Sequence, residues 1–189
     1  MNEYLLYKRI ISPEFCCGDQ KRLVEKKNSQ KVRIESNSVQ DYVLYRFDNE
    51  EQEFMPFFNK NHKDKGGLDG LRQFCDYILL MEKNNKLYVF LIELKSGNPK
   101  DAGKQLDAAE IFMDYIRRTA ERIKLTNGFT SFDSSNIRTA KVLVCGTNGA
   151  KPKTKKSKDE SVEKVEGRIN LKLNCFPISR LCEVAAEID

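Results

Sequence analysis

Residues 74–95 read FCDYILLMEKNNKLYVFLIELK, and this stretch decides the fold. Two β-prone apolar runs, Phe74–Met81 and Leu87–Leu94, flank a short polar segment. Asn84-Asn85 suits a two-residue hairpin turn, because asparagine tolerates positive φ at both central positions. Both faces of the two predicted strands are apolar, so we expect central strands that are covered on two sides.

A long amphipathic helix is predicted after the hairpin. Asn98 suits the N-cap, Pro99 suits the first helical position, and Asp101 places a negative charge in the first turn. Asn127-Gly128 is a typical end for such a helix. A single apolar stripe recurs at spacings of four and three along it: Ala102, Leu106, Ala109, Met113, Ile116, Ala120 and Ile123.

Weaker patterns predict further elements on both sides of this unit. In chain order they are a short helix near Lys21–Lys27, strands at Lys31–Ser36 and Asp41–Phe47, a loop at Asn49–Gly70, strands at Ala140–Cys145 and Leu171–Ile178, and a helix at Arg180–Ile188. We therefore expect one α/β domain over residues 1–189, with its core at 31–145 and a basic loop at 150–168. Its central mixed sheet should have about five strands and carry helices on both faces.

Composition predicts a folded, soluble protein of a reducing compartment. Hydrophobic residues make up 40% of the chain, with eleven phenylalanines to fill a core. No run approaches the roughly 18 apolar residues of a membrane span, and the opening MNEYLLYKRIISPEF is a poor signal peptide. The six cysteines show no C-x-x-C spacing and there is one histidine, which argues against zinc and favours a cytoplasmic location.

Basic residues are concentrated in two parts of the chain. Ser134–Lys158 holds seven basic residues and no acid, and Lys21–Arg33 holds six against Glu25 alone. Asp48–Glu53 is acidic. Such separation of charge favours a polyanionic partner, with a solvated surface loop as the alternative.

An acid-x-Lys tripeptide at the end of a buried strand is the best candidate for chemistry. The tripeptide occurs at 19–21, 25–27 and 93–95, and only the third ends a predicted strand. A charged pair in that position is costly unless it is paired or binds an ion.

The predicted register brings a second carboxylate to the same place. Counting outward from the turn puts Asp76 directly across from Glu93 on one face, with Lys95 two residues further on. Facing carboxylates repel one another, yet Mg²⁺ binds hard oxygen ligands of this kind. The alternative is a frayed strand end whose three charged groups are solvated or form a salt bridge.

Other catalytic motifs are absent from the sequence. There is no phosphate-binding G-x-x-x-x-G-K-[ST], no G-x-S-x-G and no dinucleotide fingerprint. One histidine, His62, excludes nuclease sites built on several histidines.

The order of these features resembles the PD-(D/E)xK phosphodiesterase superfamily, which includes restriction endonucleases, phage-type exonucleases and Holliday-junction resolvases. The resemblance covers about residues 74–145: Asp76, a hairpin, Glu-Leu-Lys at 93–95, and a helix opening with Lys-Gln-Leu at 104–106. Cys75 stands where the superfamily name has proline, which leaves the metal ligand intact.

The resemblance implies a restriction endonuclease-like core and a role for each motif residue. Asp76 and Glu93 would hold Mg²⁺ or Mn²⁺ with the Leu94 carbonyl, and the metal would activate a water molecule. Lys95 would orient that water and stabilise charge on the phosphate. Gln105 matches a glutamine at the edge of the site in several branches, although an ordinary helix-surface amide is the alternative.

Basic residues would bind the nucleic acid. Lys100 and Lys104 lie near the predicted helix N-terminus, where positive potential favours phosphate. A lysine tract, expected to be exposed, would bind the phosphate backbone of the nucleic acid: Lys151, Lys153, Lys155, Lys156 and Lys158. On superfamily grounds DNA is expected rather than RNA, with a restriction or anti-phage role and a homodimer or a defence-system protein as partner.

Two questions stay open at this level. Many superfamily members add an acid from an N-terminal helix, and Glu14, Glu25 and Glu35 are all candidates here. The same fold could also carry a catalytically silent nucleic-acid-binding module or a protein-interaction module. Silent modules usually lose one charged motif residue, and here all three are retained.

Overall fold

The computed structural model describes the hairpin, the long helix and most of the strands around them. The residues described are 3–18, 22–24, 31–35, 42–47, 74–95, 102–127, 133–145, 161–165, 167–172, 175–177 and 181–183. The loop predicted at Asn49–Gly70 and the lysine tract at 151–158 lie outside them.

The hairpin forms with the predicted register. Strand β4 (Tyr77–Lys83) pairs antiparallel with β5 (Lys86–Lys95), and Lys83 lies opposite Lys86. Asn84 and Asn85 have φ of 53° and 60°, the two positive values that a type I′ turn requires. Residues 77–81 are fully buried, which confirms that the hairpin lies at the centre of the fold.

A six-stranded mixed sheet is built around this hairpin. Its strand order is β3-β4-β5-β6-β8-β7, where β5, β6 and β8 run parallel and the other neighbours are antiparallel. The additional strands are β3 (Tyr42–Tyr45), β6 (Ile137–Cys145), β7 (Ser161–Val165) and β8 (Arg168–Lys172). Strand β7 falls within the segment expected to be a basic loop, and it raises the sheet from the expected five strands to six.

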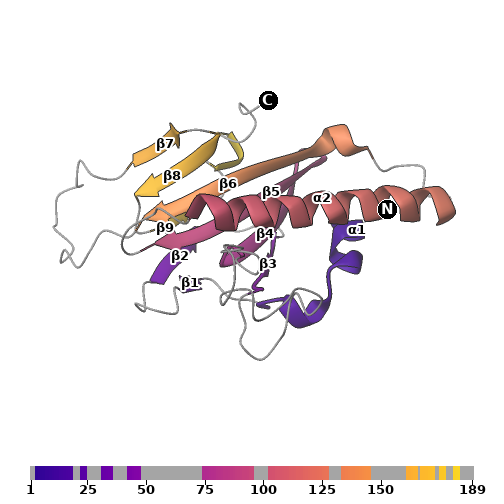
Figure 1. Ribbon diagram of the computed structural model, residues 1–189, viewed down its shortest axis with the longest axis horizontal. Helices are drawn as coiled ribbons and strands as arrows, with labels where there is room; N and C mark the ends of the chain where they lie inside the picture. The colour runs from indigo at the N-terminus through magenta and orange to yellow at the C-terminus, as the bar shows by residue number, and fades with distance from the viewer. Residues whose placement is uncertain are drawn as a thin grey trace, which may run out of the picture.

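Helix α2 (Ala102–Asn127) links the parallel strands β5 and β6 and covers one face of the sheet (Figure 1). Helix α1 (Glu3–Ile10) packs on the same side against α2, β4 and β5. The predicted apolar stripe of α2 faces the sheet: Ala102, Leu106, Ala109, Met113, Ile116 and Ala120 are buried. The helix ends at Asn127 as predicted, whereas its expected N-cap residues lie outside the described residues.

A second sheet covers the other face, where only helices were expected. It has the order β1-β2-β9 and comprises β1 (Arg22–Val24), β2 (Lys31–Glu35) and β9 (Cys175–Pro177). Leu23, Val32 and Ile34 of this sheet join one core cluster with the large sheet and with the helical residues Leu181 and Cys182.

Besides the loop expected at 150–168, which contains β7, two further predictions of secondary structure are wrong. Arg22–Val24 is a strand and not part of a helix, because its three residues gain their order by pairing with β2. The single strand expected at Leu171–Ile178 is two strands, β8 and β9, which belong to different sheets.

Two short 3₁₀ helices complete the described structure. They are η1 (Pro13–Phe15), which leads into a bridge between Cys16 and Tyr45, and η3 (Ser134–Asn136), which precedes β6. No helix among the described residues is long and apolar enough to cross a membrane.

Candidate active site

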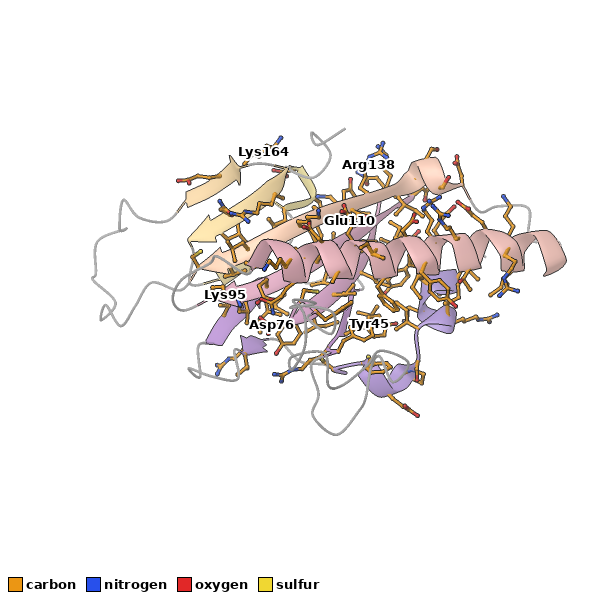
Figure 2. All side chains as sticks on the ribbon, in the orientation of Figure 1. Tyr45, Asp76, Lys95, Glu110, Arg138 and Lys164 are labelled. Carbon is orange, nitrogen blue, oxygen red and sulfur yellow. The ribbon has the colours of Figure 1, made fainter. Side chains whose placement is uncertain are left out.

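Asp76 and Glu93 meet at the open end of the β4–β5 hairpin. Tyr77, the first residue of β4, pairs with Ile92, so Asp76 precedes the strand at the level of Glu93. Glu93 follows Leu91 by two residues, and Leu91 is packed in the core cluster on the α2 side. Figure 2 shows Asp76 and Lys95 together at the end of the sheet where α2 begins.

Backbone amides hold both carboxylates in place. Oε2 of Glu93 accepts the N–H of Asp76 at 3.2 Å, and Oδ2 of Asp76 accepts the N–H of Leu94 at 2.7 Å. These side-chain contacts link Asp76, which precedes β4, to β5 beyond the last paired residues of the two strands. The strand end is ordered through Lys95 and so is not frayed, whereas the salt bridge of the alternative is present between Lys95 and Glu93.

Lys95 is held between the two remaining groups of the site. Its Nζ lies 2.7 Å from Oε1 of Glu93 and 2.8 Å from Oε1 of Gln105. Gln105 in turn donates from Nε2 to the carbonyl oxygen of Phe74 at 3.2 Å. Gln105 therefore ties the lysine of β5 to the segment entering β4.

The Glu93 carboxyl is buried in an environment that disfavours its charge. Its residue is 1% exposed, and burial followed by the charge of Asp76 raises its pKa to about 8, although Lys95 opposes the shift. Burial, and then the charge of Glu93, also raises the pKa of the neighbouring Cys75 thiol. When both carboxyls are ionised the single lysine does not compensate them, so a bound cation would favour the ionised form of Glu93.

The donor set fits a small, hard divalent cation. Asp76 and Glu93 offer carboxylate oxygens, and each oxygen that already accepts one hydrogen bond keeps a second lone pair. The Leu94 N–H points toward Asp76. In a strand the carbonyl of the same residue points the same way, so the Leu94 carbonyl also faces the two carboxylates. Among the described residues no group of three or more Asp, Glu, His or Cys could hold a metal ion. Mg²⁺ usually takes one or two carboxylates, with water and substrate completing its coordination.

The other residues expected at the site are placed less fully. Lys104 is exposed on α2 beside Gln105, whereas Lys100 and the lysine tract at 151–158 lie outside the described residues. Of the candidate N-terminal acids, Glu14 is exposed on η1, and the side chains of Glu25 and Glu35 are not among those described.

A buried N-terminal acid that the sequence did not single out has a structural role. Glu3 on α1 is buried, and its Oε1 accepts the N–H of Asp133 at 2.7 Å. Asp133 precedes β6, whose first residue pairs with the start of β5. Glu3 thus lies at the opposite end of the sheet from Glu93 and does not supply a ligand to the site.

Strand β8 adds a second group of polar side chains on the α2 face. Residues 168–172 read RINLK, and the alternation of polar and apolar residues is the signal that places Arg168 and Asn170 on one face. Ile169 and Leu171 point into the core on the opposite face. The loop expected at 150–168 and the strand expected at Leu171–Ile178 divide this segment between them and do not reflect the alternation.

Comparison of the chain with protein-family models, with curated proteins and with solved structures found no match. The geometry of four residues therefore bears on function: Asp76, Glu93, Lys95 and Gln105.

Proposed function

We propose that this protein is a metal-dependent nuclease that hydrolyses phosphodiester bonds of nucleic acid, with DNA as the expected substrate. The observation that carries the proposal is the buried Glu93 carboxylate, which lies against Asp76 at the end of a central hairpin and contacts Lys95. Carboxyl groups with perturbed pKa values cluster at functional sites, and Mg²⁺ usually binds one or two carboxylates together with substrate phosphate. The order of hairpin, helix α2 and parallel strand β6 supports the PD-(D/E)xK resemblance.

Each residue has a distinct part in this chemistry. Asp76 and Glu93 would hold Mg²⁺ or Mn²⁺, which supplies a Lewis acid for the phosphate and lowers the pKa of bound water. Lys95 uses two of its three N–H donors on Glu93 and Gln105, which leaves one for the attacking water or a phosphate oxygen. Gln105 positions the Lys95 ammonium through the contact with Phe74.

The closed hydrogen-bond network also supports a second candidate, a catalytically silent nucleic-acid-binding module. Glu93, Asp76 and Lys95 all have partners within the chain, as a purely structural polar cluster would. The two candidates differ in their need for a divalent ion. A silent module would bind nucleic acid equally with or without the metal and would leave it intact.

Cleavage assays distinguish these candidates. Purified protein is incubated with supercoiled plasmid, linear duplex, single-stranded DNA and RNA, in Mg²⁺, Mn²⁺ or EDTA. We expect cleavage of DNA that requires the metal and is lost in the Glu93→Gln variant. Glu82→Gln is the matched control, because Glu82 lies on the same hairpin near the turn. Cleavage in EDTA, or equal cleavage by Glu93→Gln, would contradict the proposal.

A further inference from the structure

Strand β8 extends the candidate site sideways across the α2 face of the sheet. Glu93 pairs with Leu143 on β6, and Leu143 pairs with Asn170 on β8. Asn170 therefore lies in the same row as Glu93, two strands away, at about 10 Å for a strand spacing near 4.8 Å. Arg168 is two residues earlier and points to the same face.

Each of the two side chains contains a buried polar atom that has no partner among the described residues. Nε of Arg168 and Oδ1 of Asn170 are buried and make no hydrogen bond in the described part of the chain. The acids opposite Arg168 on α2 are already engaged, because Asp107 and Glu110 contact Lys141 at 2.8 and 2.7 Å. An unpaired buried donor is unfavourable, and a guanidinium that has no carboxylate partner among the described residues fits an external anion.

Arg168 also lies close to the start of α2. A Cβ placed on Gly103 would meet Nη1 of Arg168 at 3.9 Å, so the guanidinium packs against the first turn of the helix. The same turn carries Lys104 and Gln105, and Gln105 contacts Lys95 of the candidate site. The guanidinium is thus near the proposed reaction centre and on the same side of the sheet.

We propose that Arg168 binds a phosphate of the substrate strand next to the phosphate that is cleaved, and that Asn170 hydrogen-bonds the same nucleotide. This inference rests on the proposed nuclease function and adds the path of the bound nucleic acid. The nucleic-acid strand passes from Asp76 and Glu93 across β6 to β8. Guanidinium groups suit this role because their planar N–H donors match phosphate oxygens in pairs.

The test measures affinity for a labelled oligonucleotide in EDTA, over a range of salt concentrations. Arg168→Gln should weaken binding about tenfold, and should reduce the slope of log K against log[salt] by about 1. Arg168→Lys should keep most of the slope and lose part of the affinity. Lys164→Gln is the matched control, because exposed Lys164 on β7 (labelled in Figure 2) pairs with Ile169, whose side chain lies on the opposite face. Unchanged affinity and slope in Arg168→Gln would overturn the inference.

A second measurement on the unmodified protein does not depend on whether the variants fold. Phenylglyoxal modifies accessible arginines, and bound oligonucleotide should protect Arg168 from it, as read by mass spectrometry. Exposed Arg118 on α2 is the internal reference and should react equally with and without oligonucleotide. Equal modification of Arg168 in both conditions would also overturn the inference. Both measurements are made without metal and do not depend on cleavage. Failure of the Arg168 inference can therefore be distinguished from failure of the proposed nuclease function.

Discussion

The backbone N–H of Asp76 donates to the carboxylate of Glu93 at 3.2 Å across the open end of the β4–β5 hairpin. The carboxylate of Asp76 in turn accepts the N–H of Leu94 at 2.7 Å. Each acid is thus fixed by the strand that carries the other, although their charges repel. Such an arrangement keeps two carboxylates ready for a cation without a large rearrangement of side chains.

Neutralising either acid should abolish cleavage. We expect Glu93→Gln and Asp76→Asn to reduce the cleavage rate at least about a hundredfold. Removing a metal ligand should lower the rate more than removing a residue that only contacts a ligand. Single-turnover rates on plasmid in Mg²⁺ measure the effect, with circular dichroism to verify the fold. A variant with either change that cuts at the unmodified rate would remove that residue from the site.

The stability of the metal-free protein should fall as pH rises between about 4.5 and 8. The pKa of Glu93 is raised from 4.5 to about 8 in the fold, so the folded state keeps a proton that the unfolded chain releases in this range. The stabilising effect of this proton is complete below pH 4.5 and is lost as the pH rises through about 8. The limiting slope for one group is about 1.4 kcal/mol per pH unit.

Urea unfolding in EDTA at several pH values measures this dependence. Glu93→Gln has no proton to release and should show a flatter profile over the same range, while Glu82→Gln should follow the unmodified protein. If the profiles of Glu93→Gln and the unmodified protein coincide, the Glu93 carboxyl does not titrate as its burial requires.

Lys95 and Gln105 should affect the reaction to different extents. Lys95→Ala removes a donor to the reacting groups and should lower kcat about 10²–10³-fold while metal binding persists. Gln105→Leu removes only the groups that position Lys95 and should lower kcat about 10–100-fold with little change in KM. If Gln105→Leu instead raises KM alone, Gln105 contacts substrate and does not act through Lys95.

The lysine tract at 151–158 gives a prediction that rests on sequence alone, because these residues lie outside the described structure. If the tract makes about three or four phosphate contacts, replacing its lysines with serine should flatten the salt slope of binding by roughly that number. The rate on saturating substrate should survive. An unchanged slope would leave a solvated loop as the better description of the tract.

The register of the site could be predicted from sequence because local chemistry determines it. Asn84-Asn85 fixes a two-residue turn, and the uninterrupted apolar runs on both sides place the hairpin in the core. Asp76 and Glu93 then face each other by counting alone. The contact of Leu94 with Asp76 could not be predicted, since it depends on the residue at which β4 begins.

The parts of the fold that were missed depend on contacts distant in sequence. Arg22–Val24 is too short for periodicity to separate strand from helix, and its pairing with β2 decides the outcome. The chain also passes from β8 in one sheet to β9 in the other, a change that no local pattern marks. The contact between Lys95 and Gln105 likewise depends on how α2 packs on the sheet.

A divalent ion should stabilise the folded protein through the two carboxylates. At about 100 times its Kd, a ligand that binds only the folded state adds about 2.7 kcal/mol, which corresponds to a rise in Tm of roughly 5–10 °C for a domain of this size. Thermal unfolding with and without Mn²⁺ measures the shift at pH 8. The rise should be largely lost in Asp76→Asn and Glu93→Gln and retained in Lys95→Ala, because Lys95 is not a ligand. An equal rise in all four proteins would place the ion elsewhere, and the paired carboxylates would then be a structural cluster held by Lys95 and the backbone.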